Sequence, residues 1–363
     1  MGIKGFAVAF AGKGSVISLK DLKNQTLAVD ASLELYRAAL GMASVKGLTD
    51  AKGRSTLHIS VILANLVAYQ TAKISTIWVF DFDPEKLSNS EHHNPLKIKE
   101  LEERREKRDK ANKKIEKLKQ DDLFTDSDSD SNSDSDSDDK AAKEDGKAAK
   151  ESKKKEIEKQ EKIAFVLQSW MVNDIKLLLN FLDIKWVEAP KGVEAECLAA
   201  RLTHEDVAEA DAVLSSDVDA LLFGATSLIK KNSKTKKYTK YDLSELLEDE
   251  EINQNQLIKL GIVLGSDMYK DKEKKLFFRI GPKSVIKKVK SGDLDGKFDD
   301  PDVKKAIDHF EMVCDVDSLE WHNENEDSYC NVEKAKHLID WLVNEKSFNR
   351  ARITKQIQKI IKL

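Results

Sequence analysis

Seven acidic residues in this 363-residue chain carry the side chains best suited to bind metal ions, and most of them follow short hydrophobic runs. Asp30 ends Leu27-Ala28-Val29, and Asp81 ends Ile77-Trp78-Val79-Phe80. Carboxylates that meet at one site repel each other unless a cation compensates them. Hard cations such as Mg²⁺ prefer such oxygen ligands, and two of them can hold a phosphodiester. The seven are Asp30, Asp81, Glu194, Glu196, Asp217, Asp219 and Asp267.

The spacing of these acids favours one shared site. Asp217 and Asp219 have a period of two after Ala212-Val213-Leu214, so in an extended segment both carboxylates would point the same way. Glu194 and Glu196 open a helix-like stretch, and in a first turn both can reach one cleft. Taken singly, each acid is more often a helix cap or a solvated surface group. Placed together after predicted strands, the acids favour a metal site.

The elements that must position these acids alternate between strands and helices. This rhythm predicts an α/β fold with a mostly parallel, twisted sheet and helices on both faces. In such a sheet the binding crevice lies beyond the carboxyl ends of the strands, which is where the acids stand.

The acidic motifs, in this order, resemble those of the xeroderma-pigmentosum-G-type (XPG) 5′-nuclease family. The resemblance covers nearly the whole chain except about 121–160, and any one motif alone is weak. Its segments are Met1–Gly5, Leu27–Ser32, Trp78–Asp81, Glu194–Cys197, Ser216–Asp219, Leu264–Asp267, the helix–two-turn–helix Ile280–Lys283 and the closing helix Phe348–Ile357.

The resemblance implies a structure-specific DNA endonuclease that cuts 5′ flaps in replication and repair, with 5′→3′ exonuclease activity. It implies two Mg²⁺ ions per site, for which Mn²⁺ can substitute, held by the seven acids, with Glu194 acting through water. Two alternatives stay open: a non-catalytic scaffold that binds branched nucleic acid on the same fold, and a ribonuclease of the related PIN-like fold. The full set of acids argues for catalysis, because a scaffold has no need of mutually repelling carboxylates.

In the family, an inserted helical arch places a lysine and an arginine near the scissile phosphate. The pattern of residues 96–104 assigns these catalytic roles to Lys97 and Arg104, which share one helical face; a solvated helix face is the alternative. Tyr36 matches the family's base-stacking aromatic, although Leu33 and Leu40 on the same stripe are also compatible with a core position.

The resemblance also implies contacts with branched or flapped DNA. A glycine turn before a helix exposes backbone N–H groups to a phosphate. Arg279 replaces the usual first glycine of this turn, so the monovalent-cation site of the family is not expected. The run Lys230–Lys240 is either a second duplex contact or a mobile loop. The residues assigned to DNA are Gly2, Tyr36, Gly281, Lys283, Lys287 and Lys288.

Composition agrees with an intracellular nucleic-acid enzyme. No run approaches the length of a membrane span, and Cys197, Cys314 and Cys330 lack the spacing of zinc ligands, so we expect reduced thiols. The net charge is −4, but residues 121–139 hold nine aspartates, and without them the chain is basic by about 5. This Ser-Asp tract is predicted to be disordered, because it cannot bury enough apolar surface. It is either a solubilising spacer or a polyanion that competes with DNA.

The chain divides into four predicted regions. We expect a monomer in the nucleus, or at a viral replication site if the source is a large DNA virus. The family's clamp-binding motif is not seen after Leu363, which leaves binding to a sliding clamp uncertain. The regions are 1–82 and 163–255 for the nuclease core, 83–162 for the arch insert, and 256–363 for the helix–two-turn–helix and C-terminal helices.

Overall fold

A computed structural model describes residues 3, 5–40, 48–82, 95–125, 139–232, 235, 237–269, 274–278, 280–323 and 332–361. Within the two helices of the insert it describes side chains for 102–120 and 151–164. Gly2, Arg279 and Cys330 lie outside these residues, as does 126–138 of the Ser-Asp tract.

The fold is organised around one eight-stranded sheet with the order β1-β7-β6-β5-β2-β3-β4-β8. The five central strands from β6 to β4 are mutually parallel, whereas β7, β1 and β8 add antiparallel edges. The mostly parallel sheet predicted from the sequence is therefore confirmed, with the antiparallel edges as an addition. The strands are β1 (Ser15–Ile17), β2 (Thr26–Asp30), β3 (Ser75–Phe80), β4 (Trp186–Glu188), β5 (Ala212–Leu214), β6 (Ser227–Lys231), β7 (Tyr238–Asp242) and β8 (Trp321–His322).

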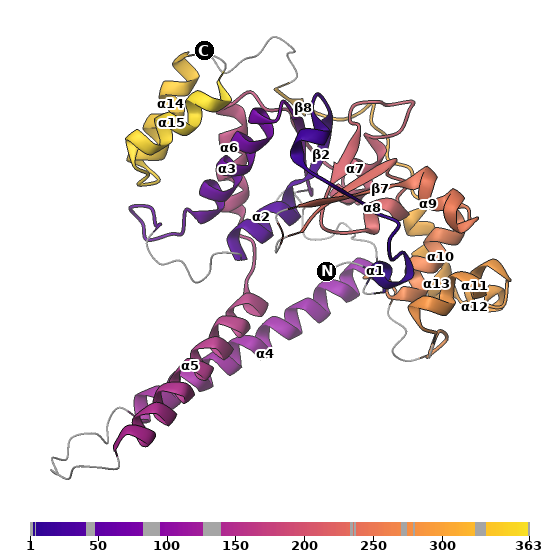
Figure 1. The fold of residues 1–363 in the computed structure, drawn as a ribbon, viewed down its shortest axis with the longest axis horizontal. Helices are drawn as coiled ribbons and strands as arrows, with labels where there is room; N and C mark the ends of the chain where they lie inside the picture. Colours follow the sequence, from indigo (N-terminus) through magenta and orange to yellow (C-terminus); the bar gives the residue numbers. More distant parts are fainter. Residues whose placement is uncertain are drawn as a thin grey trace.

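Helices cover both faces of this sheet, as Figure 1 shows. Successive strand residues point to opposite faces; Leu27 and Val29 pack in one core, and Ala28 between them packs in the other. The first core also holds side chains of α2 (Ala31–Leu40), α3 (Leu57–Thr71), α6 (Ser169–Phe181), α14 (Val332–Asn344) and α15 (Arg350–Ile360). The second core holds side chains of α1 (Phe6–Ala9), α7 (Ala195–Arg201), α8 (Asp219–Leu222), α9 (Leu243–Glu250), α10 (Gln254–Leu264), α11 (Pro282–Lys290), α12 (Asp295–Phe298) and α13 (Pro301–Phe310). The remaining helical element, η1 (Leu19–Leu22), is a short 3₁₀ helix.

The insert between β3 and β4 forms an arm of two long helices, α4 (Pro95–Thr125) and α5 (Asp139–Ala164), which lie side by side and project from the body (Figure 1). Ala111 and Ile115 are buried between them, and Lys114 pairs with Glu156 across the seam at 2.5 Å. From the sequence we predicted a helix that carries Lys97 and Arg104, which is α4, and no second helix for the arm. The disorder predicted over 121–139 stays a prediction; α4 ends at Thr125 and α5 begins at Asp139, and the residues between them are outside the described part of the chain.

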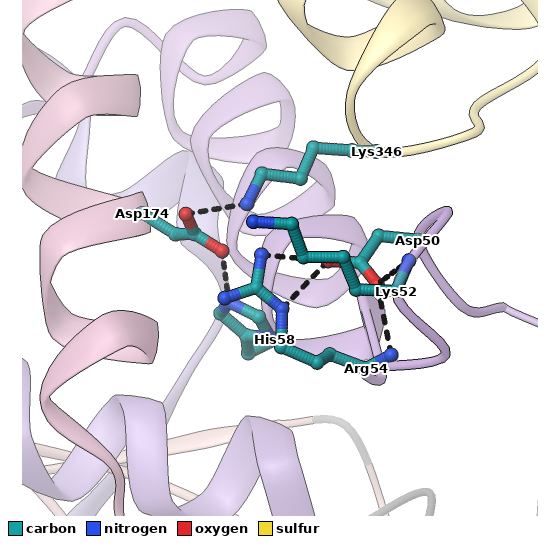
Figure 2. Close-up of polar contacts among 6 residues, drawn as sticks. All are labelled: Asp50, Lys52, Arg54, His58, Asp174 and Lys346. Carbon is teal, nitrogen blue, oxygen red and sulfur yellow. Dashed lines mark hydrogen bonds and ion pairs between the residues drawn. The ribbon is translucent and has the colours of Figure 1, made fainter.

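A buried charged cluster joins three segments on the face opposite α7 (Figure 2). The Asp174 carboxylate of α6 lies 3.3 Å from His58 Nε2 on α3 and accepts a hydrogen bond of 2.6 Å from Lys346 Nζ in the turn after α14. Burial favours a higher pKa for Asp174, but the bonds from His58 and Lys346 outweigh it and hold that pKa below its usual value. Beside them, Arg54 pairs with Asp50 and stacks on Trp170. The cluster therefore anchors the C-terminal helices to α3 and α6.

We expect Lys346→Met to lower the free energy of unfolding by about 3 kcal/mol, because it leaves a buried carboxylate without its cation. Lys110→Met is the control, since Lys110 and Glu106 form an exposed pair worth about 0.5 kcal/mol or less. Urea unfolding of both variants measures the difference. Equal losses would show that Lys346 acts as an ordinary surface charge.

Two regions differ in detail from the sequence prediction. The run Lys230–Lys240 is largely a β-hairpin, because β6 extends to Lys231 and pairs with β7. The closing helix begins at Arg350, behind the cap Asn349, rather than at Phe348. None of the described helices has the length and apolar character needed to cross a membrane.

Candidate active site

Four neighbouring parallel strands, β5, β2, β3 and β4, end at the same edge of the sheet, and acids follow each of them. Asp30 is the last residue of β2, and Asp81 directly follows β3. Asp217 comes three residues after β5, and Glu194 six residues after β4. The sequence placed these acids at the carboxyl ends of strands, and this placement is confirmed.

Asp30 and Asp81 also hold the starts of two helices. Asp30 is buried, and its Oδ1 accepts a hydrogen bond of 3.0 Å from the Leu33 N–H in the first turn of α2. Asp81 is exposed, and its Oδ1 accepts the Ala195 N–H at 3.1 Å, at the start of α7. Helix N-termini stabilise negative charge. Asp30 and Asp81 can therefore each cap a helix and also bind a metal ion, so the two interpretations do not exclude each other.

The segment Asp217–Asp219 differs from the prediction. Asp219 is the first residue of α8, and Val218 already has helical dihedral angles, so the two acids do not alternate along an extended strand. The backbone turns because Asp217 Oδ1 accepts the Asp219 N–H at 3.3 Å, while the Asp217 N–H donates to Ser215 Oγ at 3.1 Å. Both carboxyl groups are buried, and they still lie beside each other through this turn.

The remaining acids come from α7 and from the end of α10. Glu194 is the N-cap residue of α7, and Glu196 lies in its first turn, as predicted. Asp267 follows α10 by three residues, and its Oδ2 lies 3.4 Å from Arg104 Nη2 on the arm. The arm arginine therefore reaches the acid-bearing edge across 163 residues of sequence.

Electrostatic effects connect all seven acids. Burial and then the nearby charges of Asp81 and Asp217 raise the pKa of Asp30 to about 7. Burial and the charge of Asp30 raise the pKa of Glu196 well above its usual value. The pKa of Asp219 is also raised, first by burial and then by Asp217, Asp267 and Glu194. Without a cation, this edge of the sheet therefore resists full ionisation.

The chemistry of this edge fits divalent cations that prefer oxygen. The donor set is entirely carboxylate, and Asp219 Oδ1 is buried without a hydrogen-bond partner among the described residues. In the described part of the chain, no three Asp, Glu, His or Cys side chains converge closely enough to hold a metal as they stand. Like charges this near one another repel, and a bound cation would offset that repulsion.

Burial of the Asp30 carboxyl group, together with repulsion from Asp81 and Asp217, predicts that Asp30→Asn stabilises the metal-free protein. The folded-state pKa of Asp30, about 7, lies above its unfolded value, so the folded state holds the proton longer. As pH rises from about 4 to 7, wild type loses up to about 1.4 kcal/mol of stability per pH unit through this group. Asn cannot ionise and avoids that loss. Urea unfolding in chelator at pH 5 and pH 7.5 tests this, and parallel pH profiles of the two proteins would contradict it.

Tyr36 is half-buried on α2, and its ring centroid lies 5.6 Å from that of Phe165, just beyond α5. Tyr36 therefore sits where the arm joins the body, neither fully in the core nor fully exposed. Lys97 belongs to α4, but its side chain lies outside the described ones.

Four of the predicted DNA contacts lie along α11: Gly281 and Lys283 are at its start, and Lys287 and Lys288 are in its last turn. Gly281 is its N-cap residue, Pro282 follows, and the Lys283 and Lys287 side chains are exposed while Lys288 is half-exposed. An N-terminus with nearby lysines provides N–H groups and positive charge for a phosphate. Cys197 and Cys314, which the sequence predicts to be reduced thiols, are buried and form no disulfide among the described residues.

Sequence reasoning missed two groups beside the acids. The hydroxyl of Ser215 lies 3.4 Å from Asp30 Oδ2 and also holds the Asp217 backbone. Lys230, at the end of β6, has a pKa lowered first by burial, with opposing attraction from Asp217. Ser215 could have been found in the sequence, because it lies between the β5 residues and Asp217. Lys230 was overlooked because it belongs to a run of lysines that we interpreted as a DNA contact or a loop.

The comparisons with known proteins agree with this geometry. Two family profiles match: the XPG N-terminal domain over residues 1–111 and the XPG I-region over residues 183–267, which together contain all seven acids. Flap endonuclease 1 of Methanocaldococcus jannaschii is 26% identical over 352 residues, 96% of this chain and 92% of that protein. Flap endonuclease 1-A of Sorghum bicolor is 26% identical over 386 residues, 99% and 86% of the two chains.

Solved structures show the same fold. Flap endonuclease-1 from Methanococcus jannaschii superposes with a TM-score of 0.67 at 23% identity, covering 99% of this chain and 98% of that one. Human GEN1 bound to Holliday junction DNA superposes with a TM-score of 0.59 at 15% identity, covering 99% and 77%. With both profiles of one family matched in order, on that family's fold, the chain belongs to the XPG family.

Proposed function

We propose that this protein is a divalent-metal-dependent, structure-specific DNA endonuclease that cuts 5′ flaps and also removes nucleotides from 5′ ends. The observation that carries the proposal is the gathering of seven acids at the carboxyl edge of the parallel strands in a chain of the XPG family. The relatives named flap endonuclease 1 align along nearly the whole chain, which supports this substrate class.

Asp30, Asp81, Glu196, Asp217, Asp219 and Asp267 would hold two Mg²⁺ ions, directly or through water, with Glu194 in an outer position. When bound, such ions supply a water of lowered pKa and stabilise the leaving oxygen. The carboxylates themselves orient this centre, because Asp30 and Asp81 are fixed to the first turns of α2 and α7.

The arm and the C-terminal helices would position the DNA. Arg104, which reaches Asp267, and Lys97 on the same helix would stabilise negative charge on the scissile phosphate. Tyr36 would stack on a base near the cut. Gly281 and Lys283 at the start of α11, together with Lys287 and Lys288 in its last turn, would bind duplex phosphates.

A panel of labelled substrates tests the proposal. We expect Mg²⁺-dependent cleavage of a 5′-flap duplex at its branch point, faster than cleavage of gapped, bubble or four-way substrates of the same sequence. Chelator is the control. Tight binding to branched DNA without cleavage of any substrate in Mg²⁺ or Mn²⁺ would instead support the scaffold reading, and preferential cleavage of single-stranded RNA would support the ribonuclease reading.

A further inference from the structure

A buried histidine from the C-terminal helices lies against the acidic edge. His309 is in the last turn of α13, whose other buried residues, including Val303, Ala306 and Phe310, face the second core. Its side chain is 4% exposed. Burial of an imidazole is costly unless its nitrogens are hydrogen-bonded, so the contacts of this ring define its role.

The contact that matters is with Glu194. His309 Nε2 lies 3.4 Å from Glu194 Oε2, and the glutamate side chain is 11% exposed. When Glu194 is ionised its carboxylate can only accept, and in that state His309 Nε2 must carry the hydrogen and donate it. The two residues are 115 positions apart, which means that α13 supplies this donor to the N-cap of α7.

Aromatic packing fixes the histidine ring. The ring of Phe223 meets it edge-on at 5.4 Å, and that of Phe310 does so at the same distance. Phe223 directly follows α8, the helix that begins with Asp219. The imidazole therefore sits between the segments that carry Glu194 and Asp219, where a shift of the ring would move the glutamate.

The position of Glu194 influences the other acids, since its charge contributes to the raised pKa values of both Glu196 and Asp219. A donor to Glu194 draws its carboxylate toward α13. In metal sites generally, hydrogen bonds that orient the carboxylates are worth about 10–100-fold in metal affinity.

We propose that His309 is a positioning residue that holds the Glu194 carboxylate in place for divalent-cation binding, and so links the C-terminal helices to the acidic site. The inference rests on the proposed function for the identity of the site. It gives α13 a role beyond packing, because α13 contacts α10 and α10 contacts α11, the expected DNA-binding helix.

Two substitutions of the same histidine separate positioning from packing. His309→Gln keeps an N–H donor near the position of Nε2, whereas His309→Leu fills the space without a donor. Ile307→Val is the matched control, since it loosens the packing of α13 in the second core and leaves the histidine ring and its donor in place. The primary measurement is Mn²⁺ binding to the DNA-free protein, followed by electron paramagnetic resonance, with urea unfolding in chelator to verify folding.

We expect His309→Leu to weaken Mn²⁺ binding about tenfold or more, with His309→Gln and Ile307→Val remaining within about twofold of wild type. The Mg²⁺ concentration for half-maximal single-turnover cleavage should rise in the leucine variant alone, with unchanged DNA affinity. Equal Mn²⁺ affinity in all four proteins, or equal losses in the leucine and glutamine variants, would overturn the proposal. If wild type binds Mn²⁺ but cuts no flap, the proposed function fails, while the Mn²⁺ comparison still decides the role of His309.

Discussion

Asp219→Ala will lower single-turnover cleavage of a 5′-flap substrate by about a thousandfold or more, which corresponds to about 4 kcal/mol of lost transition-state stabilisation. Asp219 begins α8, and its Oδ1 is buried without a partner among the described residues, so this oxygen is available to a cation. Asp81→Ala should have a similar effect, because Asp81 lies at the same edge and raises the pKa of Asp30.

Binding of DNA should persist in both variants, because phosphate contacts elsewhere supply most of the affinity. Asp249→Ala is the control, since this exposed aspartate of α9 pairs with Lys13 away from the acidic edge. Quenched-flow cleavage and fluorescence anisotropy measure the two quantities separately. Near-normal cleavage by either variant would remove the two-metal assignment.

Arg104→Ala is expected to slow single-turnover cleavage by about a hundredfold and to weaken flap binding much less. A cation that acts on charge developing in the transition state affects the rate more than it affects ground-state binding. The contact between Arg104 Nη2 and Asp267 Oδ2 places the guanidinium at the acidic edge before DNA arrives.

Arg105→Ala is the matched control for this prediction. Arg105 is the next residue of α4, carries the same charge and is exposed on another face of the helix. It should change neither rate nor affinity by more than about threefold, as expected for a single exposed phosphate contact. If Arg104→Ala reduces affinity and leaves the rate unchanged, Arg104 is an ordinary contact to the DNA backbone.

Periodicity in the sequence was sufficient to predict the sheet and the placement of its acids. Alternate residues of β2, such as Leu27 and Ala28, are buried in different cores, so the strand reads as a continuous apolar run that stops at Asp30. The start of α7 was also predictable, because Glu194 and Glu196 precede the apolar residues of that helix. These features depend on neighbours within a few positions.

Features that depend on distant neighbours were not predicted. The helix that begins at Asp219 replaces an extended segment because Asp217 and Ser215 hold its backbone. The charged cluster joins His58, Asp174 and Lys346, and each of these looks like a surface residue in its own segment. The second helix of the arm was missed because α5 has few large apolar residues, Ile157 and Ile163. Its contacts with α4 include the ion pair between Lys114 and Glu156, which the sequence does not reveal.

The arm also has an evolutionary consequence. It occupies the connection between β3 and β4, two strands that pair directly with each other, so the pairing of these strands does not involve the arm. Lengthening such an insert costs little, since the entropy of closing a loop grows only with the logarithm of its length. Mutations could therefore add or delete whole turns at the far end of the hairpin, while Arg104 near its base keeps its place beside Asp267. Descendant enzymes could acquire different substrate preferences by resizing this one appendage, with the inherited acids left unaltered.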